Sequence, residues 1–592
     1  MGHRGKRRVS AWAPQTRRSF LRRAGFAGSA AASLGLLAGC SDGSDDRVSR
    51  TPGSSAQVFS HGVASGDPLA DRIMLWTRVT PPAAQQVSVN WMLSDTPDMI
   101  SPLRSGTVMT SADSDYTVKV DATGLEAGTT YYYRFETLGE SSPLGRTRTL
   151  PADGVDRLRI AVLSCSNYPF GFFNVYGRVA ERADLDLVLH LGDYIYEYPG
   201  RGVSAEENPD EYGDGREIGR APEPPYEIVT LEDYRTRHAC YKTDPDLQEL
   251  HRQHPMIAVW DDHESTNNSW RGGAQNHDPD RGEGEWSRRE AVSIKAYYEW
   301  LPIREIEPGN PDIIYRGFDL GGLAALTMLD TRLIGRDEQL AANAPGGSGF
   351  VDSGDYTDEG RTLIDAPQRQ WLAERLSANN ATWQLIGQQV MFGQLKAVGA
   401  PNASNTDNPG GQGGVFLNSD QWDGYPRARE KVWDIIRGGQ AAPNVAINNV
   451  VVLTGDIHTS WAMDITEDPN NPDAYDPDTG AGSMAVEFVG TSVTSPGSDA
   501  SPDAIKAQNP HMKYVQLASR GYLLLDITAE RVQGEWWYVD DILTRNEQQR
   551  FAAAYRVRAG ENRVVEASGM TTPRTDAPAL APAADTQSVQ DA

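Results

Sequence analysis

Residue types that bind metal ions follow four short apolar segments of this 592-residue chain. The segments are LRIAVLS, LDLVLHLG, MIAVW and NVVVLTG. A single aspartate after a strand usually caps a turn, whereas four such places with thiol, phenol, imidazole and carboxylate groups indicate one shared metal site. The residues that follow the segments are, in chain order, Cys165; Asp193 and Tyr196; Asp261, Asp262, His263 and Glu264; and Asp456 and His458.

The donor types predict which ions would bind. A thiolate and a phenolate must each lose a proton to bind, which favours a strongly Lewis-acidic ion, and phenolate and carboxylate suit ferric iron. Asp193 can bridge two ions, Asp262 and Asp456 offer further hard oxygens, and the imidazole of His458 can complete an iron shell. Oxygen-rich positions suit calcium, magnesium or manganese. Two ions about 3.5–4 Å apart would clamp a phosphoryl group and activate a bridging water as hydroxide.

Further side chains could act on a phosphate. His263 is either a metal ligand, a helix cap or, as we expect, a general acid that protonates the leaving oxygen. Arg332, in the LDTR motif, either binds two phosphate oxygens through the paired donors of its planar guanidinium group or only pairs with a carboxylate. Asn268 either contacts phosphate or forms a turn, and Asp423 and Tyr425 in DQWDGY are expected to shape the rim.

The apolar segments that precede these residues are typical of an α/β domain, which we place at residues 151–545. Short strands alternate there with helical stretches such as residues 288–302 and 365–378, the second with Asp365 as a plausible N-cap. Open α/β sheets place their sites beyond the carboxyl ends of the strands. The four segments are therefore expected to deliver their polar residues to one edge.

Residues 57–150 are strand-like throughout. VSVNWML, YTVKVDA and TYYYRFET alternate or are rich in β-branched and aromatic residues, with turn residues between them. We predict a β-sandwich of the fibronectin or immunoglobulin type, which by itself offers no chemistry.

The composition excludes several classes of protein. Hydrophobic residues make up 39% and charged residues 23% of the chain, which excludes a collagen-like, fully disordered or polytopic membrane protein. A net charge of −26 argues against wrapping of a nucleic-acid backbone. Three cysteines exclude a disulfide scaffold.

The first forty residues are expected to be a targeting signal. Arg17 and Arg18 stand in TRRSFLRRAGF, which resembles a twin-arginine export signal, and an apolar run follows at residues 24–37. The tetrapeptide that ends at Cys40 resembles a lipobox. Either Cys40 is lipidated and anchors the protein to a membrane, or cleavage nearby discards it. We expect export by the twin-arginine machinery to the periplasm, the cell surface or the medium.

Two further segments flank the predicted domains. Residues 41–56 are rich in Ser, Gly and Asp and are expected to form a linker. Residues 546–592 are expected to form a C-terminal extension, disordered from Gly569 onward because Pro, Ala, Thr and Asp dominate there.

An ordered set of motifs resembles one protein family. FSHGVASGDP, SCSN, HLGDYIYE, WDDHESTNN, LDTR, DQWDGY and LTGDIHTSW occur in this order between residues 57 and 545. The set resembles the PhoD-like alkaline phosphatases, which belong to the calcineurin-like metallophosphoesterases related to purple acid phosphatases. The resemblance implies a four-layer α/β/β/α catalytic domain after the N-terminal sandwich.

The resemblance also implies ligands. By motif, ferric iron would be held by Cys165, Asp193, Tyr196 and His458. A first calcium would lie at Asp193, Asp262 and Asp456, and a second calcium near the phosphate would draw on Glu264, Asn268 or Asp330. His263, Arg332 and Asn268 would be the catalytic side chains.

The resulting expectation is an exported phosphoesterase that hydrolyses phosphate monoesters, diesters or both with a metal-activated hydroxide. Activity should favour neutral to alkaline pH and should be lost with a calcium chelator. One alternative is a phosphodiesterase or phospholipase D-type enzyme with little monoesterase activity. Another is a cell-surface binding protein whose metals only stabilise the fold.

Overall fold

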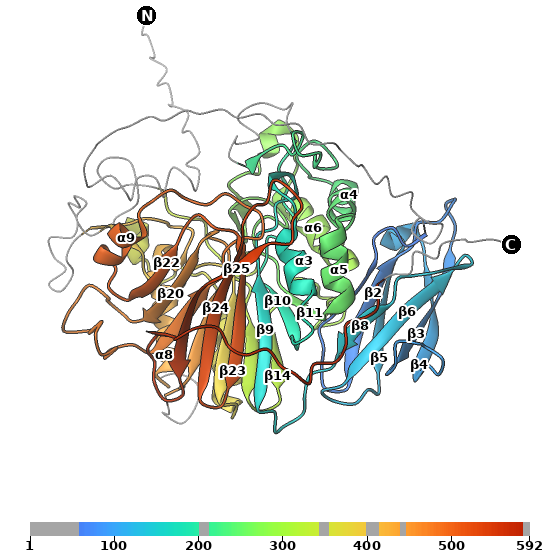
Figure 1. The fold of residues 1–592 in the computed structure, drawn as a ribbon. Coiled ribbons are helices and arrows are strands. Elements are labelled where there is room, and N and C mark those ends of the chain that lie inside the picture. The colour runs from blue at the N-terminus through green and yellow to red at the C-terminus, as the bar shows by residue number, and fades with distance from the viewer. Residues whose placement is uncertain (1–57, 201–211, 342–353, 398–413, 439–445, 584–592) are drawn as a thin grey trace, which may run out of the picture.

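The computed structural model describes residues 58–200, 212–341, 354–397, 414–438 and 446–583. The predicted export signal, Cys40 and the linker at residues 41–56 lie outside the described residues. Figure 1 shows a small strand-rich part, drawn in blue, beside a larger part that contains two sheets and their helices. Among the described helices, none is both long enough and apolar enough to cross a membrane.

The N-terminal part is a sandwich of two strand layers. Their inner faces share one apolar core that includes Leu75, Val89 and Tyr133, all inaccessible to solvent. The first layer is β1 (Val63–Gly66), β2 (Arg72–Arg78) and β5 (Thr117–Thr123); the second is β3 (Val87–Ser94), β4 (Arg104–Thr110), β6 (Thr130–Thr137), β7 (Glu140–Ser141) and β8 (Gly145–Arg148).

One layer of the sandwich continues into the larger part. Gly66 of β1 pairs in parallel with Met256, so β1, β2 and β5 form the far end of a ten-stranded sheet. The sandwich therefore shares a sheet with the larger part and is not a separate structural unit. The expected domain boundary at residue 150 crosses this continuous sheet and stays a prediction.

The remaining strands of the ten-stranded sheet come from the beginning and the end of the sequence of the larger part. Its order is β26-β25-β24-β23-β9-β10-β11-β1-β2-β5, and β9, β10 and β11 are parallel. The added strands are β9 (Arg157–Leu163), β10 (Leu187–His190), β11 (Met256–Ala258), β23 (Gly521–Thr528), β24 (Arg531–Val539), β25 (Gln549–Arg558) and β26 (Val565–Glu566).

A seven-stranded sheet packs against it, with the order β14-β15-β16-β19-β21-β20-β22. Its strands are β14 (Arg316–Leu320), β15 (Ala324–Met328), β16 (Trp383–Gln388), β19 (Val450–Thr454), β20 (Ser460–Ile465), β21 (Ala485–Val489) and β22 (Met512–Gln516). Two short ribbons pair β12 (Ser269–Trp270) with β13 (Gly273–Ala274) and β17 (Lys396–Ala397) with β18 (Val415–Phe416).

Helices cover the outer faces of the two sheets. The α-helices are α3 (Asn174–Ala180), α4 (Leu231–Tyr241), α5 (Pro245–Gln253), α6 (Trp286–Trp300), α7 (Ala366–Ala378), α8 (Pro426–Ile436) and α9 (Pro502–Gln508). Short 3-10 turns are η1 (Ala112–Ser114), η2 (Tyr168–Phe170), η4 (Pro279–Arg281), η5 (Gly354–Thr357) and η7 (Trp422–Gly424). As predicted, Asp365 caps α7, and its side chain accepts the Gln368 amide at 2.8 Å.

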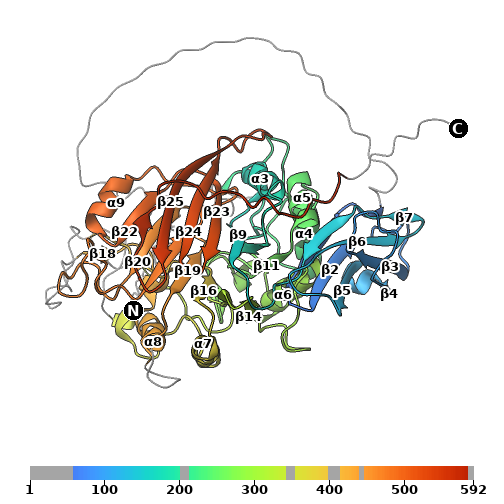
Figure 2. The same ribbon diagram turned by 60° about the horizontal axis from the view of Figure 1, so that its bottom comes forward.

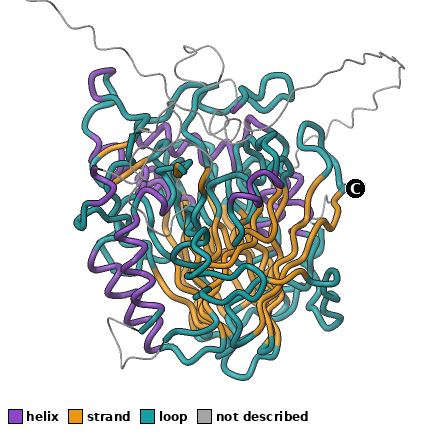
Figure 3. Tube along the Cα trace, turned by 90° about the vertical axis from the view of Figure 1, so that its left-hand side faces the viewer, coloured by secondary structure: helices purple, strands orange, loops and turns teal. Residues whose placement is uncertain are grey.

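The larger part has four layers, which confirms the predicted fold class. One apolar core joins α3 and α5 to the ten-stranded sheet and joins the two sheets to each other. A second core joins α7 and α8 to the other face of the seven-stranded sheet. Figure 2 shows α3 and α5 on one outer side and α7 and α8 on the other. In Figure 3 the strands lie together in the interior.

The C-terminal region differs from the expected extension. β25 and β26 join the ten-stranded sheet beyond residue 545. Residues 571–582, which we call the C-terminal strap, run back along the molecule to the sandwich (Figure 1). Buried side chains bind the backbone at Gly569, Pro578 and Ala581, in the segment for which the composition predicts disorder.

Candidate metal centre

The candidate centre lies in the loops that follow β9, β10, β11 and β19. Five residues other than glycine in these loops adopt left-handed backbone conformations, with φ of 61° at Cys165, 55° at Asp193, 52° at Asn268, 58° at Asp456 and 62° at His458. Residues other than glycine rarely adopt this backbone conformation. Where they do, they often lie at functional sites, because the surrounding structure holds the strained backbone in place. The backbone thus marks the residues that the sequence singled out.

Two glycines let these loops approach each other. Gly192 has a φ of 102°, and a methyl group added there would lie only 2.4 Å from the Cβ of Asp261. A methyl group added at Gly455 would lie 2.8 Å from the Cβ of Ser164. Larger residues at either position would push the ligand-bearing loops apart.

The first cluster contains the four predicted iron ligands. The ligand atoms of Cys165, Asp193 and His458 lie within 4.8 Å of one another. The Tyr196 hydroxyl donates to Asp193 Oδ2 at 3.0 Å and lies 3.2 Å from His458 Nε2. All four side chains are buried. The structure therefore brings a thiol, a carboxyl, a phenol and an imidazole together.

Neighbouring groups orient this cluster. His458 Nδ1 lies 3.1 Å from the Pro496 carbonyl, which can only accept, so Nδ1 carries the proton and Nε2 faces the cluster. Ser495 Oγ lies 2.8 Å from the Tyr196 hydroxyl and donates to the Cys165 carbonyl at 3.2 Å. Sequence reasoning missed Ser495, because no motif marks it.

Two further clusters continue from the first: the second shares Asp193 with it, and the third shares Asp262 with the second. One consists of Asp193, Asp262 and His263, and the other of Asp261, Asp262 and Asp456; in each, one ligand atom per residue lies within 4.8 Å of the others. Asp193 and Asp262 thus connect the clusters, as expected for a bridged site. Sequence reasoning quoted Asp261 but did not name it as a ligand, although it directly follows the same segment as Asp262.

Arg332 lies beneath these carboxylates. Its side chain is inaccessible to solvent and its nitrogens donate to three carboxylates: Nε to Asp261, Nη1 to Asp420 at 2.8 Å and Nη2 to Asp456 at 2.7 Å. These contacts favour the carboxylate-pairing alternative over contact with substrate. The arginine would orient ligands rather than bind phosphate.

His263 is held between a carboxylate and a ring. Its Nδ1 lies 2.6 Å from Glu197 Oε2, and its ring stacks on Tyr196 with centroids 4.2 Å apart. Glu197 also accepts the Asn267 amide at 2.8 Å. The pKa of Glu197 stays below its usual value because His263 and these hydrogen bonds outweigh burial. Glu197 was missed, although it ends the HLGDYIYE motif.

The residues suggested for a second calcium are already engaged. Glu264 accepts three backbone amides: those of Tyr194 at 2.6 Å, Asp261 at 2.8 Å and Asp193 at 3.1 Å. Its carboxylate therefore holds two ligand loops together, which argues against Glu264 as an ion ligand.

Asp330 and Asn268 have contacts of their own. Asp330 Oδ1 accepts the Arg332 amide at 2.8 Å and the Leu333 amide at 3.0 Å. The Asn268 amide donates to Asp262 Oδ2 at 2.7 Å, and its side chain donates to Gln275 at 2.5 Å. The Asn268 backbone, rather than its side chain, orients a ligand here.

The DQWDGY motif supports the centre from one side. Gln421 Nε2 donates to Asp456 Oδ2 at 2.6 Å, a contact that sequence reasoning did not predict. Asp423 pairs with Arg429 at 2.8 Å, and the Tyr425 hydroxyl donates to the Asp337 carbonyl at 2.6 Å. Asp423 and Tyr425 thus have structural contacts.

The balance of charge among the buried side chains of the candidate centre shows whether metal cations would fit there. Burial raises the pKa of Asp261 well above its usual value, and burial together with Asp193 does the same for the Cys165 thiol. Uncompensated buried charge is costly, so a donor set of this kind fits metal cations. Buried carboxyl groups outnumber buried guanidinium groups among the described residues of the centre. The carboxyl groups include Asp193, Glu197, Asp261, Asp262, Glu264, Asp330, Asp420 and Asp456, and the guanidinium groups are those of Arg332 and Arg336.

Comparisons with known proteins agree on one family. Residues 160–536 match the PhoD-like phosphatase family, and residues 46–151 match the PhoD-like phosphatase N-terminal domain. The chain is 37% identical over 538 residues to alkaline phosphatase D of Bacillus subtilis (strain 168), covering 88% of this chain and 84% of that protein. It also resembles a solved structure of PhoD, with a TM-score of 0.73, 33% identity, and coverage of 88% of this chain and 94% of that one.

Proposed function

The chain belongs to the PhoD-like phosphatase family, and on that basis we propose that it is an exported, metal-dependent phosphoesterase. Membership makes it a phosphoric ester hydrolase whose substrate is a phosphate ester. Hydrolysis of monoesters, diesters or both by an activated hydroxide, and export by the twin-arginine route with or without a lipid anchor at Cys40, are the finer parts of the proposal.

One observation carries the proposal: three clusters of buried donor atoms are linked in a row, the first to the second by Asp193 and the second to the third by Asp262. In the proposed assignment Cys165, Asp193, Tyr196 and His458 hold ferric iron. Asp193, Asp262 and Asp456 hold calcium, with Asp261 close enough to take part. We propose no ligand set for the second calcium: Glu264 accepts three backbone amides, and Oδ1 of Asp330 accepts two.

The ions, when bound, would lower the pKa of a water and stabilise charge on the phosphoryl oxygens. The protein's own side chains position the reaction. His263, held by Glu197, is placed beside Asp193 and Asp262 to give a proton to the leaving oxygen. Arg332 and the backbone amide of Asn268 orient the carboxylates.

The experiment is the substitution Asp193→Asn, measured with 4-nitrophenyl phosphate and bis(4-nitrophenyl) phosphate. The asparagine side chain lacks the negative charge with which Asp193 would bridge two ions. We therefore expect metal content to fall and kcat to drop at least about 100-fold on whichever ester the protein hydrolyses. Asp540→Asn is the matched control, because Asp540 is exposed and only loosely paired with Arg550 at 3.8 Å.

The outcomes separate the alternatives. Turnover that survives Asp193→Asn, while added calcium still raises the melting temperature, would mean that the metals serve only the fold. Turnover of the diester with little turnover of the monoester would instead place the protein among phosphodiesterases.

A further inference from the structure

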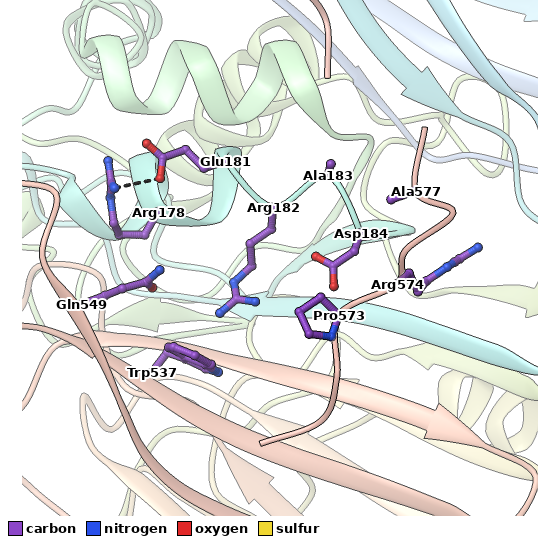
Figure 4. A pocket seen from close by; sticks show the side chains of 10 residues that line it. All are labelled: Arg178, Glu181, Arg182, Ala183, Asp184, Trp537, Gln549, Pro573, Arg574 and Ala577. Carbon is purple, nitrogen blue, oxygen red and sulfur yellow. Dashed lines mark hydrogen bonds and ion pairs between the residues drawn. The ribbon is translucent and has the colours of Figure 1, made fainter. Parts of the chain in front are cut away.

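A cavity of about 400 Å³ lies on the outer face of the ten-stranded sheet, beside α3. It opens between the end of α3, strands β24 and β25, and the C-terminal strap, and shares no lining residue with the metal centre (Figure 4). Its lining residues are Arg178, Glu181, Arg182, Ala183, Asp184, Trp537, Gln549, Pro573, Arg574 and Ala577.

Arg182 is fixed within this cavity by aromatic rings. Its guanidinium carbon lies 4.4 Å from the centre of the Trp537 ring and 5.4 Å from that of Tyr522, and these two rings are stacked. Its Nε donates to the Tyr522 hydroxyl at 2.6 Å, and that hydroxyl donates to Gln549 at 2.8 Å. Stacking and the hydrogen bond from Nε hold the planar guanidinium in one orientation. Nε is engaged by Tyr522, and the edge formed by the two Nη groups is left for a ligand.

Arg182 differs from the other arginines of the cavity. Arg178 pairs with Glu181 at 2.7 Å, and Arg574 pairs with Asp186 at 2.9 Å. Within the part of the chain that the structure describes, no carboxylate lies within ion-pair distance of Arg182. A guanidinium that is oriented but lacks an anionic partner is pre-organised to take one from a ligand.

The lining defines the class of that ligand. Arg178 and Arg574 already pair with Glu181 and Asp186, so Arg182 is the lining guanidinium that remains for a ligand. A doubly charged phosphate is attracted to it more strongly than a singly charged group, and phosphate oxygens match the two Nη donors. Ala183, Pro573 and Ala577 add an apolar wall, and the volume exceeds what a bare phosphate needs. We propose that this cavity binds a small organic phosphate, with the phosphate group on the Nη edge of Arg182.

Phenylphosphonate is a suitable probe because a phosphoesterase cannot hydrolyse its carbon–phosphorus bond. Isothermal titration calorimetry should show a binding event in the wild type that Arg182→Gln weakens at least about tenfold, the size expected for a charge-assisted bidentate pair. The same event should persist in Asp193→Asn, which separates it from binding at the metal centre. The inference therefore does not depend on the proposed function.

Matched variants define the remaining outcomes. Arg288→Gln should leave binding unchanged, because Arg288 is exposed on α6 and is not one of the residues that line the cavity. Ala577→Trp should abolish the event by filling the cavity while Arg182 is retained, which provides a test even if Arg182→Gln misfolds.

Benzoate, a monoanion of similar shape, should bind more weakly than phenylphosphonate. Equal affinities in the wild type, Arg182→Gln and Ala577→Trp, or tighter binding of benzoate, would overturn the proposal.

Discussion

Lys242 is a buried ammonium held by aromatic groups. Its side chain is 1% exposed, and its Nζ donates to the Tyr194 hydroxyl at 3.0 Å and lies 4.5 Å from the centre of the Trp76 ring. No carboxylate pairs with it among the described residues, and the neighbouring His238 and His251 are neutral because burial lowers their pKa values. Burial lowers the pKa of Lys242 to about 7.

This environment predicts a pH dependence of stability. Between pH 7 and the ordinary lysine pKa of 10.5, the unfolded chain keeps a proton that the folded protein has released. The free energy of unfolding therefore rises with pH, by up to about 1.4 kcal/mol per pH unit from this group. Lys242→Met lacks this contribution, so urea denaturation at pH 7, 8 and 9 should show the wild type gaining stability relative to the variant.

Lys295→Met provides the comparison, because Lys295 lies half exposed on α6 and pairs with Glu299 at 3.5 Å. Its difference from the wild type should stay constant over the same range. A constant difference for Lys242→Met as well would mean that Lys242 remains charged in the folded protein.

At the scale of elements, the C-terminal strap joins the sandwich to the larger part. The Tyr132 hydroxyl of β6 donates to the Ala579 carbonyl at 3.0 Å, and Arg146 of β8 donates to the Pro578 carbonyl at 3.3 Å. On α5, Gln253 both donates to the Ala581 carbonyl at 3.1 Å and accepts its amide at 2.8 Å. Arg146 and Gln253 are almost inaccessible, so the strap adds hydrogen bonds to buried polar groups and supplies the amide that the Gln253 side-chain oxygen accepts.

Removal of residues 569–592 should therefore destabilise the protein. Several hydrogen bonds are lost at about 0.5–1.5 kcal/mol each, so we expect the free energy of unfolding to fall by about 2–5 kcal/mol, partly relieved as water reaches the freed arginines. Urea denaturation checks this. A chain that lacks only residues 584–592 keeps every described contact and should match the full chain; equal stability of the shorter chain would contradict the role of the strap.

At the scale of the whole molecule, ion binding at the proposed metal centre should be coupled to folding, because the carboxylates that would bind the ions are buried. A cation that binds the folded chain alone stabilises it by mass action, about 2.7 kcal/mol at 100 times its dissociation constant. The melting temperature should therefore fall on treatment with a calcium chelator and rise again with the logarithm of added calcium.

Differential scanning fluorimetry of the wild type and Asp193→Asn measures this coupling. The variant should show a smaller calcium response, because one shared carboxylate of the clusters is gone. A wild-type melting temperature that is indifferent to both chelator and calcium would show that no calcium binds the folded protein tightly, and would remove calcium from the proposed site.

The grouping of the candidate ligands could be predicted from the sequence, whereas their role as metal ligands stays a prediction. Buried strands have a recognisable composition, and parallel strands carry the residues after their carboxyl ends to a common edge, so Cys165, Asp193 and His458 could be assigned to one cluster from sequence. Asp365 could be recognised as an N-cap because capping is a local interaction.

The partners of these residues were not predictable. Arg332 joins Asp261 and Asp456 over 71 and 124 residues of chain, and Glu264 joins amides of two separate loops. A carboxylate that binds backbone amides and one that binds an ion have the same sequence signature, so only the three-dimensional contacts distinguish them. The same holds for the C-terminal strap, whose composition predicts disorder although buried side chains far away in sequence bind its backbone.

Local pattern thus determined the fold class, the ligand-bearing loops and the family of this protein. The tertiary structure alone decided that Arg332 donates to several carboxylates, that one sheet runs from the sandwich through the larger part, and that Arg182 lines a cavity with no ion-paired carboxylate among the described residues. The physical reason is that strand and cap propensities depend on neighbours in the chain, whereas charge pairing, burial and cavities depend on which distant segments meet.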